Sequence, residues 1–191
     1  PLKQLIGHQE PRDEREQRYR EICSRQVTTL VRLVDDLLDL SRINTGKVEL
    51  RKERVSLSTI IEHAVQTSAP LVQKQKHEFV LSMPPEEIRL IADRTRLTQV
   101  VSNLLNNAAK YSPPGGRIDL VVVREGQEVV ITVRDRGIGI RPEMLDSVFG
   151  LFVQSDRTAD RSQGGLGIGL TLVKSLVELH GGTVTAHSEG I

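Results

Sequence analysis

The sequence predicts an α+β protein in which a helical hairpin or bundle remnant is followed by an α/β sandwich. Residues up to about 45 carry apolar side chains at helical spacing. From residue 46 onward, helix-patterned segments alternate with short β-rich runs. The turn-forming sequence Asn44-Thr-Gly-Lys47 separates the two parts, so we expect domains at residues 1–45 and 46–191.

The composition excludes several classes of function. The 26 basic and 25 acidic side chains nearly cancel, so neither nucleic acid nor an anionic membrane is an expected partner. No apolar run approaches the roughly 20 residues that span a bilayer. We therefore expect no direct membrane contact and a cytoplasmic location, in a protein whose remainder is either anchored or soluble. The single Cys23 forms no internal disulfide, which suits a reducing compartment.

A long helix is predicted from about Pro11 to Asn44, because proline and the acidic residues Asp13 and Glu14 favour a helix start. Its apolar stripe is broad and needs more than one neighbouring helix. A bundle completed by a second chain and a helix packed on its own domain account for the stripe equally well. The stripe consists of Val27, Leu30, Leu33, Val34, Leu37, Leu38 and Leu40.

The second domain is predicted to begin with a strand, a helix and two further strands. The helix starts at Ser58 or Thr59, with Glu62 placed for a capping box, and runs to about Lys74. The β-rich runs are residues 48–57, 78–82 and 88–92. Mixed elements of these lengths indicate an α/β sandwich.

The next helix, residues 94–110, carries a polar face. Asn103, Asn107, Lys110 and Tyr111 follow one another at spacings that place all four on one side. The apolar residues on the opposite side, which can be buried against a sheet, are Val101, Leu104, Leu105 and Ala108. Such a polar stripe is most often a solvated surface, but amides and a lysine also suit Mg²⁺ and phosphate oxygens.

A β-hairpin is predicted around Gly126-Gln127, with strands at residues 117–125 and 128–134. The second strand leads into the sequence Asp135-Arg-Gly-Ile-Gly139. An acidic residue followed by glycines could accept a hydrogen bond from an exocyclic amine such as that of adenine. On this fragment alone, an ordinary Asp-x-Gly turn is the simpler interpretation.

The C-terminal part contains a phenylalanine segment, a polar loop and a glycine-rich loop. Phe149 and Phe152 lie on a predicted short helix over residues 144–154. Residues 154–163 are polar and unpatterned, which is typical of a loop that closes over a ligand or of a surface excursion. The run Gly164-Gly-Leu-Gly-Ile-Gly-Leu170 then opens a helix that ends at Leu179, and a last strand is expected at residues 183–187.

Alternate glycines at a helix start favour phosphate binding, because backbone N–H groups and the helix dipole face the same point. Two common phosphate loops do not fit. A dinucleotide fingerprint follows a strand, whereas Gly164 follows a polar run, and a Walker A loop ends in Gly-Lys-Ser or Gly-Lys-Thr, whereas Leu170 follows the last glycine here. The His-Arg-Asp and Asp-Phe-Gly motifs of protein kinases are also absent from the sequence.

Taken together and in this order, the four segments resemble the N, G1, F and G2 boxes of sensor histidine kinases, within the Bergerat-fold ATPase superfamily. They are residues 97–111, Asp135–Gly139, Phe149-Gly-Leu-Phe152 and Gly165-Leu-Gly-Ile-Gly-Leu170. The resemblance covers nearly the whole chain, with residues 1–45 similar to the end of the dimerisation and histidine-phosphotransfer region. It implies a two-layer sandwich in which helices cover one face of a mixed sheet.

The resemblance also implies a role for each motif residue. Asn107 would coordinate Mg²⁺, and Asn103 would orient groups beside it. Lys110 and Tyr111 would reach the phosphate and sugar side of ATP, while Asp135 would bind the adenine amine. The remaining positions assigned to the ATP site are Gly137, Ile138 and Gly139, then Gly165, Leu166, Gly167, Ile168, Gly169 and Leu170, with residues 154–163 as the ATP lid.

The implied reaction is transfer of the ATP γ-phosphoryl group to a histidine on the dimerisation helices of a homodimer, then to an aspartate of a response regulator receiver domain. Pro1-Leu2 resembles the end of the family's phosphoacceptor box. The acceptor histidine is therefore expected just upstream of Pro1, and we expect residues 1–191 to lack their own phosphorylation site. The five histidines present, His8, His63, His77, His180 and His187, are expected to be turn, surface or cap residues.

Two departures from the family pattern leave alternatives open. Gly150-Leu151 occupies the middle of the F box, where Glu-Pro is common, and glycine is expected to loosen that short helix. The family's final strand is expected beyond Ile191. One alternative is a degenerate or phosphatase-biased kinase that docks a regulator. A serine kinase of the anti-sigma type or an ATP-driven clamp is disfavoured, because neither would carry the Leu30–Leu40 helix.

Overall fold

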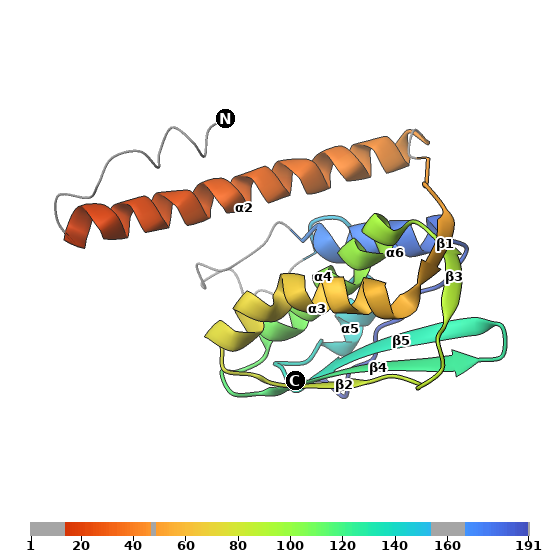
Figure 1. The fold of residues 1–191 in the computed structure, drawn as a ribbon. Coiled ribbons are helices and arrows are strands. Elements are labelled where there is room, and N and C mark those ends of the chain that lie inside the picture. Colours follow the sequence, from red (N-terminus) through yellow and green to blue (C-terminus); the bar gives the residue numbers. More distant parts are fainter. Residues whose placement is uncertain (1–13, 47–48, 154–166, 191) are drawn as a thin grey trace. The chain divides into compact units, whose positions relative to one another are not determined.

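The computed structural model describes residues 14–46, 49–153 and 167–190 (Figure 1). The chain divides into two compact units, Pro1–Lys47 and Val48–Ile191. The described part of the first unit is one long helix, α2 (Glu14–Asn44). Several large apolar side chains of the predicted stripe, among them Leu30, Val34 and Leu38, are half exposed, whereas Leu40 is buried. No described helix has an apolar run that is long enough to cross a bilayer.

The second unit contains a mixed three-stranded sheet and a separate two-stranded sheet. In the mixed sheet, β4 pairs in parallel with β2 and antiparallel with β5. The antiparallel pair β1–β3 forms the smaller sheet. The strands are β1 (Glu53–Ser56), β2 (Glu78–Ser82), β3 (Arg89–Ala92), β4 (Arg117–Glu125) and β5 (Glu128–Asp135), and the helices are α3 (Leu57–Lys74), α4 (Arg94–Tyr111), α5 (Pro142–Leu145) and α6 (Gly169–Leu179).

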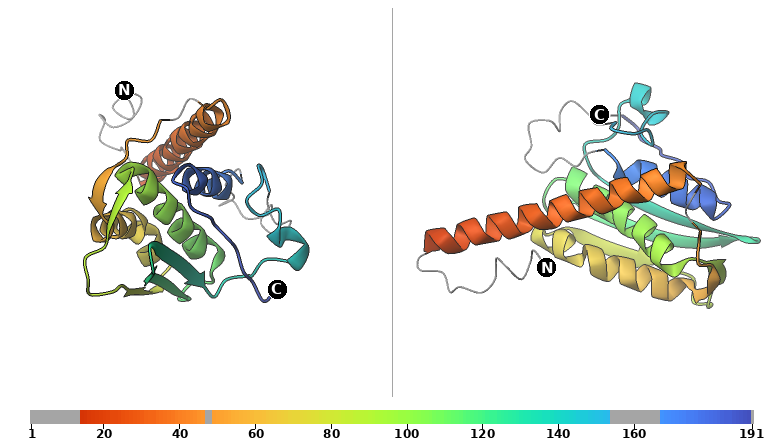
Figure 2. Two further views of the ribbon diagram at one scale, coloured as in Figure 1. Left: turned by 90° about the vertical axis from the view of Figure 1, so that its right-hand side faces the viewer. Right: turned by 90° about the horizontal axis from the view of Figure 1, so that it is seen from above.

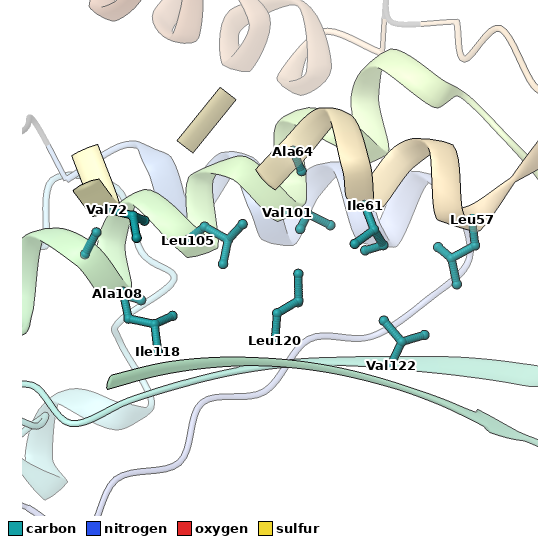
Figure 3. Close-up of a cluster of buried hydrophobic side chains, with 11 residues drawn as sticks. Leu57, Ile61, Ala64, Val72, Val101, Leu105, Ala108, Ile118, Leu120 and Val122 are labelled. Carbon is teal, nitrogen blue, oxygen red and sulfur yellow. The ribbon is translucent and has the colours of Figure 1, made fainter. Parts of the chain in front are cut away.

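The core lies between one face of the mixed sheet and the helices α3 and α4 (Figure 3). Alternate residues of β4 point toward the helices, because side chains of a strand alternate between its two faces. Ile118, Leu120 and Val122 are accordingly buried, and they meet Leu57 and Ile61 of α3 and the apolar face of α4. This arrangement is the predicted two-layer sandwich with helices on one face of a mixed sheet.

Three local predictions were wrong. The helix α3 begins at Leu57 with Ser56 as its N-cap, not at a capping box formed with Glu62. Tertiary contacts fix this start, because Leu57 is fully buried and its N–H donates to the Ile88 carbonyl over 2.9 Å. No strand forms at residues 183–187. The described C-terminal segment is instead tied to the turn after β5 by its Ser188 hydroxyl, which accepts a hydrogen bond from the Ile140 N–H.

The phenylalanine segment also differs from its prediction. Helix α5 starts earlier, at Pro142, and ends at Leu145, before either phenylalanine. Residues 146–152 form successive tight turns, and the Gly150 N–H donates to the Ser147 carbonyl over 2.7 Å. A Cβ on Gly150 would lie 2.9 Å from that carbonyl oxygen, so glycine is required by the turn.

Candidate nucleotide-binding site

Helix α4 is the element that carries the polar face predicted for the site. Asp93 caps its N-terminus, because the carboxylate accepts a hydrogen bond from the Arg96 N–H over 3.1 Å. Val101, Leu105 and Ala108 are buried in the core, as predicted. The opposite side of the helix is thereby directed away from the core. Asn103, Asn107, Lys110 and Tyr111 are all partly buried.

The polar side chains of α4 differ in how their hydrogen bonds are satisfied. The Asn103 Nδ2 atom is buried and has no hydrogen-bond partner among the described residues. An unsatisfied buried donor is costly, so a water, an ion or a ligand is expected to satisfy it; the Thr98 and Ser112 hydroxyls are in the same situation. The Lys110 ammonium donates to the Tyr111 hydroxyl over 2.9 Å and lies 4.5 Å from the centre of that ring. The two residues at the end of α4 therefore form one polar unit.

The turn after β5 packs directly against the end of α4. The Ile138 N–H donates to the Tyr111 carbonyl over 3.2 Å. A Cβ on Gly137 would lie 2.7 Å from the same carbonyl oxygen, so only glycine allows this approach. The structure thus brings together two motifs that lie more than twenty residues apart in the sequence.

Asp135 lies at the end of β5 and is exposed. One of its carboxylate oxygens accepts a hydrogen bond from the Gly137 N–H over 2.8 Å, which orients the carboxylate within its own turn. Gly139 adopts a left-handed conformation with φ at +72°, and a Cβ there would collide with the Gly190 carbonyl. The C-terminal segment therefore forms one wall of this turn.

The start of α6 packs against the phenylalanine segment. Gly167 has φ at +71°, and a Cβ there would lie 2.7 Å from the Val153 carbonyl oxygen. The Thr171 hydroxyl donates to the Gly150 carbonyl over 2.8 Å. The F and G2 motifs therefore form one local structure. Phe152, although bulky, has φ at 61° and is 61% exposed.

Helices α4 and α6 pack side by side, α6 in blue and α4 in green in Figure 2. His180, the C-cap residue of α6, contacts Asp93, the N-cap residue of α4, so the two helices run antiparallel. The 11 residues of α6 extend roughly 16 Å. An equal length of α4, counted from Arg94, ends at Leu104, so we infer that the start of α6 lies close to the level of Asn103.

The residues at this site suit a nucleoside triphosphate. A Cβ on Gly169 would meet no atom of the described structure within 4 Å, so the start of α6 borders open space. Backbone N–H groups at a helix start are donors for phosphate oxygens. Within residues 14–46, 49–153 and 167–190, no cluster of three or more His, Cys, Asp or Glu side chains could hold a metal. A magnesium ion does not need such a cluster, because one amide oxygen of the protein, the phosphate oxygens of the nucleotide and water can hold it.

The predicted site residues are only partly described. The structure places Ile168, which is 2% exposed, and Leu170 at the start of α6. Gly165, Leu166 and the predicted ATP lid at residues 154–163 lie outside the described residues.

Sequence reasoning missed the contacts that hold the motifs together. They are the bonds from Thr171 to Gly150, from Asp93 to His180 and from His77 to α4. Of these residues, only Asp93 has a recognisable signal, as an acidic residue directly before a helix. His77, expected at the surface, is 9% exposed and its Nε2 lies 2.9 Å from the Ala109 carbonyl oxygen.

Comparison with known proteins agrees with the resemblance to sensor histidine kinases that the sequence motifs indicate. Residues 92–190 match the model of the histidine kinase-, DNA gyrase B- and HSP90-like ATPase family. The sensor histidine kinase WalK of Bacillus subtilis is 33% identical over 178 residues, which cover 90% of this chain and 28% of WalK. The chain spans 11% to 29% of the length of eight curated relatives that it matches.

Solved histidine kinases share the fold. The histidine kinase AdeS of Acinetobacter baumannii matches with a TM-score of 0.74 and 25% identity, covering 99% of this chain and 85% of that chain. The histidine kinase ThkA, solved in complex with the response regulator protein TrrA, matches in fold with a TM-score of 0.69 and 20% identity, covering 99% of this chain and 52% of that chain. The chain therefore belongs to the histidine kinase-, DNA gyrase B- and HSP90-like ATPase family, and its second unit is a sensor histidine kinase catalytic ATP-binding domain.

Proposed function

We propose that this chain binds Mg-ATP and transfers the γ-phosphoryl group to a histidine on the dimerisation helices, from which it passes to an aspartate of a response regulator. The observation that carries the proposal is the contact between the Asp135 turn and the end of α4, made by the Ile138 N–H and the Tyr111 carbonyl. This contact supports one site to which Asp135 contributes an acceptor for the adenine amine and α4 contributes its polar face. In this proposal the start of α6 supplies phosphate donors close to the level of Asn103.

Each part of the nucleotide has a partner in this proposal. Asp135 accepts a hydrogen bond from the adenine amine, and Gly137 and Gly139 let the flat ring approach the backbone. Lys110 and Tyr111 face the sugar and phosphates. The N–H groups of the glycine loop and the start of α6 hold the phosphate chain, where pre-oriented donors stabilise the charge of the transferring group.

Magnesium would be held by the amide oxygen of Asn107 together with phosphate oxygens, and Asn103 would orient groups beside it. When bound, the ion neutralises charge on the transferring phosphoryl group. The orphaned Asn103 Nδ2 supports a ligand at this position, because ligand oxygens would satisfy it.

We further propose that residues 1–45 belong to the dimerisation and histidine-phosphotransfer region and residues 46–191 to the catalytic domain. The half-exposed apolar side chains of α2 support a homodimer, because a second chain would cover them. The acceptor histidine lies upstream of Pro1 in this proposal, so residues 1–191 do not phosphorylate themselves. A response regulator receiver domain is the proposed downstream partner, as TrrA is for ThkA in the solved complex.

Calorimetric titration with a non-hydrolysable ATP analogue tests the nucleotide site. We expect binding that tightens with Mg²⁺ and weakens at least about tenfold in Asp135→Asn, since the amide cannot reproduce a charged acceptor. Asp35→Asn, an exposed position on α2, is the matched control and should bind as the unchanged chain does. Absence of binding to the folded chain would contradict the proposal.

A phosphoryl-transfer assay separates the active kinase from the degenerate, regulator-docking alternative. The chain is supplied with labelled ATP and a peptide that carries a histidine-kinase acceptor helix. Transfer to the peptide histidine, lost in Asp135→Asn, supports the kinase. Nucleotide binding without transfer favours the alternative, and label on a histidine within residues 1–191 would contradict the upstream acceptor. Gly150 does not favour the alternative, because the tight turn requires it.

A further inference from the structure

His180 connects the two helices that carry the site. It is the C-cap residue of α6, and its Nδ1 lies 2.7 Å from the Leu176 carbonyl oxygen of the same helix. Its Nε2 lies 3.0 Å from the backbone nitrogen of Asp93, the N-cap residue of α4. One imidazole ring thus joins the end of the glycine-loop helix to the start of the asparagine-bearing helix.

The hydrogen-bond partners assign the state of this ring. The Asp93 N–H is a donor, so Nε2 must accept and carries no proton. The Leu176 carbonyl is an acceptor, so Nδ1 must donate. The only form that makes both bonds is the neutral ring with its proton on Nδ1. An asparagine can reproduce the Nδ1 donor but is too short to reach Asp93, whereas a glutamine places an amide oxygen near the position of Nε2.

Asp93 is itself fixed from three directions. Its carboxylate accepts one hydrogen bond from the Arg96 N–H over 3.1 Å and another from the Arg51 N–H over 3.0 Å, while its own N–H donates to His180. Asp93 is 8% exposed, so these bonds are shielded from water. His180 therefore ties the end of α6 to a residue that is itself held by several hydrogen bonds.

We propose that His180 is a positioning residue for the phosphate chain of the nucleotide, an inference that rests on the proposed function. In this proposal the bond to Asp93 sets the register of the antiparallel helices. The start of α6, roughly 16 Å along the helix from His180, then lies close to the level of Asn103. The adenine contact is set independently, by the Asp135 turn against Tyr111. Loss of the His180–Asp93 bond should therefore weaken binding of the phosphates and spare binding of the adenine.

The test compares His180→Asn, which removes the bond, with His180→Gln, which keeps an acceptor. His63→Asn, at an exposed position on α3, is the matched control. Each protein is titrated with a non-hydrolysable Mg-ATP analogue and with adenosine. For His180→Asn we expect affinity for the analogue to fall about fivefold, the equivalent of one hydrogen bond. Its affinity for adenosine should stay within about twofold of the value for the unchanged chain. The affinities of His180→Gln and His63→Asn for both ligands should stay within the same range.

Equal weakening for both ligands in His180→Asn, or no weakening for either, would overturn the positioning role. Failure of the unchanged chain to bind the analogue would instead overturn the proposed function. If His180→Asn does not fold, the hydrogen bond between Asp93 and His180 can still be tested on the unchanged chain. Isotope-labelled protein should show an NMR coupling across the hydrogen bond between the Asp93 nitrogen and His180 Nε2, and a proton on Nδ1. A proton on Nε2 would contradict the assignment.

Discussion

At the residue scale, the glycines of the site have different surroundings and therefore different roles. A Cβ on Gly137 would strike the Tyr111 carbonyl oxygen, whereas a Cβ on Gly169 would meet nothing within 4 Å. Gly137 is thus needed for the fold of the site itself. Gly169 has no such need within the described structure, so its small size matters only if a ligand approaches the start of α6.

We predict that Gly169→Ala separates stability from binding. Alanine at a helical position with free space should leave the free energy of unfolding unchanged or raise it by up to about 1 kcal/mol. Affinity for an ATP analogue should fall, because the new methyl group occupies space assigned to the phosphates. Urea unfolding and calorimetry on the same samples check both statements. Unchanged affinity would show that the phosphates do not approach Gly169.

We predict the opposite pattern for Gly137→Ala. The added methyl group would lie 2.7 Å from the Tyr111 carbonyl oxygen and 2.5 Å from an Asp135 carboxylate oxygen. Overpacking of this kind costs about 1–3 kcal/mol. Unfolding free energy and nucleotide affinity should therefore fall together, and a variant with wild-type stability would contradict the tight approach.

At the scale of elements, α4 couples the core to the site, since it has one face in each. Leu105 is 1% exposed and packs between α3 and β4. Leu105→Ala should lower the free energy of unfolding by about 2–5 kcal/mol, because it removes buried surface and leaves a cavity. Leu179→Ala, at a 37% exposed position on α6, is the control and should cost clearly less in the same urea titration. Equal costs would argue against the core in Figure 3.

The outer face of the sheet carries an ion pair with a pH-dependent effect on stability. The Arg117 guanidinium beside Asp119 holds the pKa of that carboxyl below its ordinary value, first through the hydrogen bond and then through its charge. Because the pKa is lower in the folded chain than in the unfolded one, the stabilisation is present at neutral pH and is lost as the pH falls through the lowered value.

Asp119→Asn removes this contribution, so the variant should be slightly less stable than the unchanged chain at pH 7. The difference in unfolding free energy should shrink as the pH falls below about 4, where the unfolded chain takes up the proton, and vanish below the lowered pKa of the folded Asp119. Urea titrations at several pH values check this, and a difference that grows on acidification would contradict it.

Most elements were predictable because their signals are local. The hairpin at Gly126 has flanking β-rich runs and a glycine with φ at +63°, and α4 has both an acidic N-cap and apolar periodicity. The errors occur where tertiary contacts decide. Leu57 starts α3 one or two residues earlier than predicted because it is buried, and residues 183–187 form no ladder although they alternate as a strand would.

At the scale of the whole molecule, the site is composed of segments from residue 93 to residue 190. Sequence motifs predicted the residues of the proposed site, but not the bonds that bring their segments together. The approach of Gly137 to Tyr111 depends on how β5 is placed relative to α4, and the role of His180 depends on two helices that are some seventy residues apart in the sequence. Such contacts carry no periodicity and therefore leave no pattern in a single sequence.

The central claim is that one nucleotide lies between the Asp135 turn, the polar face of α4 and the start of α6. Backbone NMR of the labelled chain, titrated with a non-hydrolysable Mg-ATP analogue, tests this claim most directly. We expect the largest shift changes at the amides of Gly137, Ile138, Gly139, Gly167, Ile168 and Gly169, with small changes in α2 and on the outer face of the sheet. Saturable binding that leaves these six amides unshifted would contradict the claim.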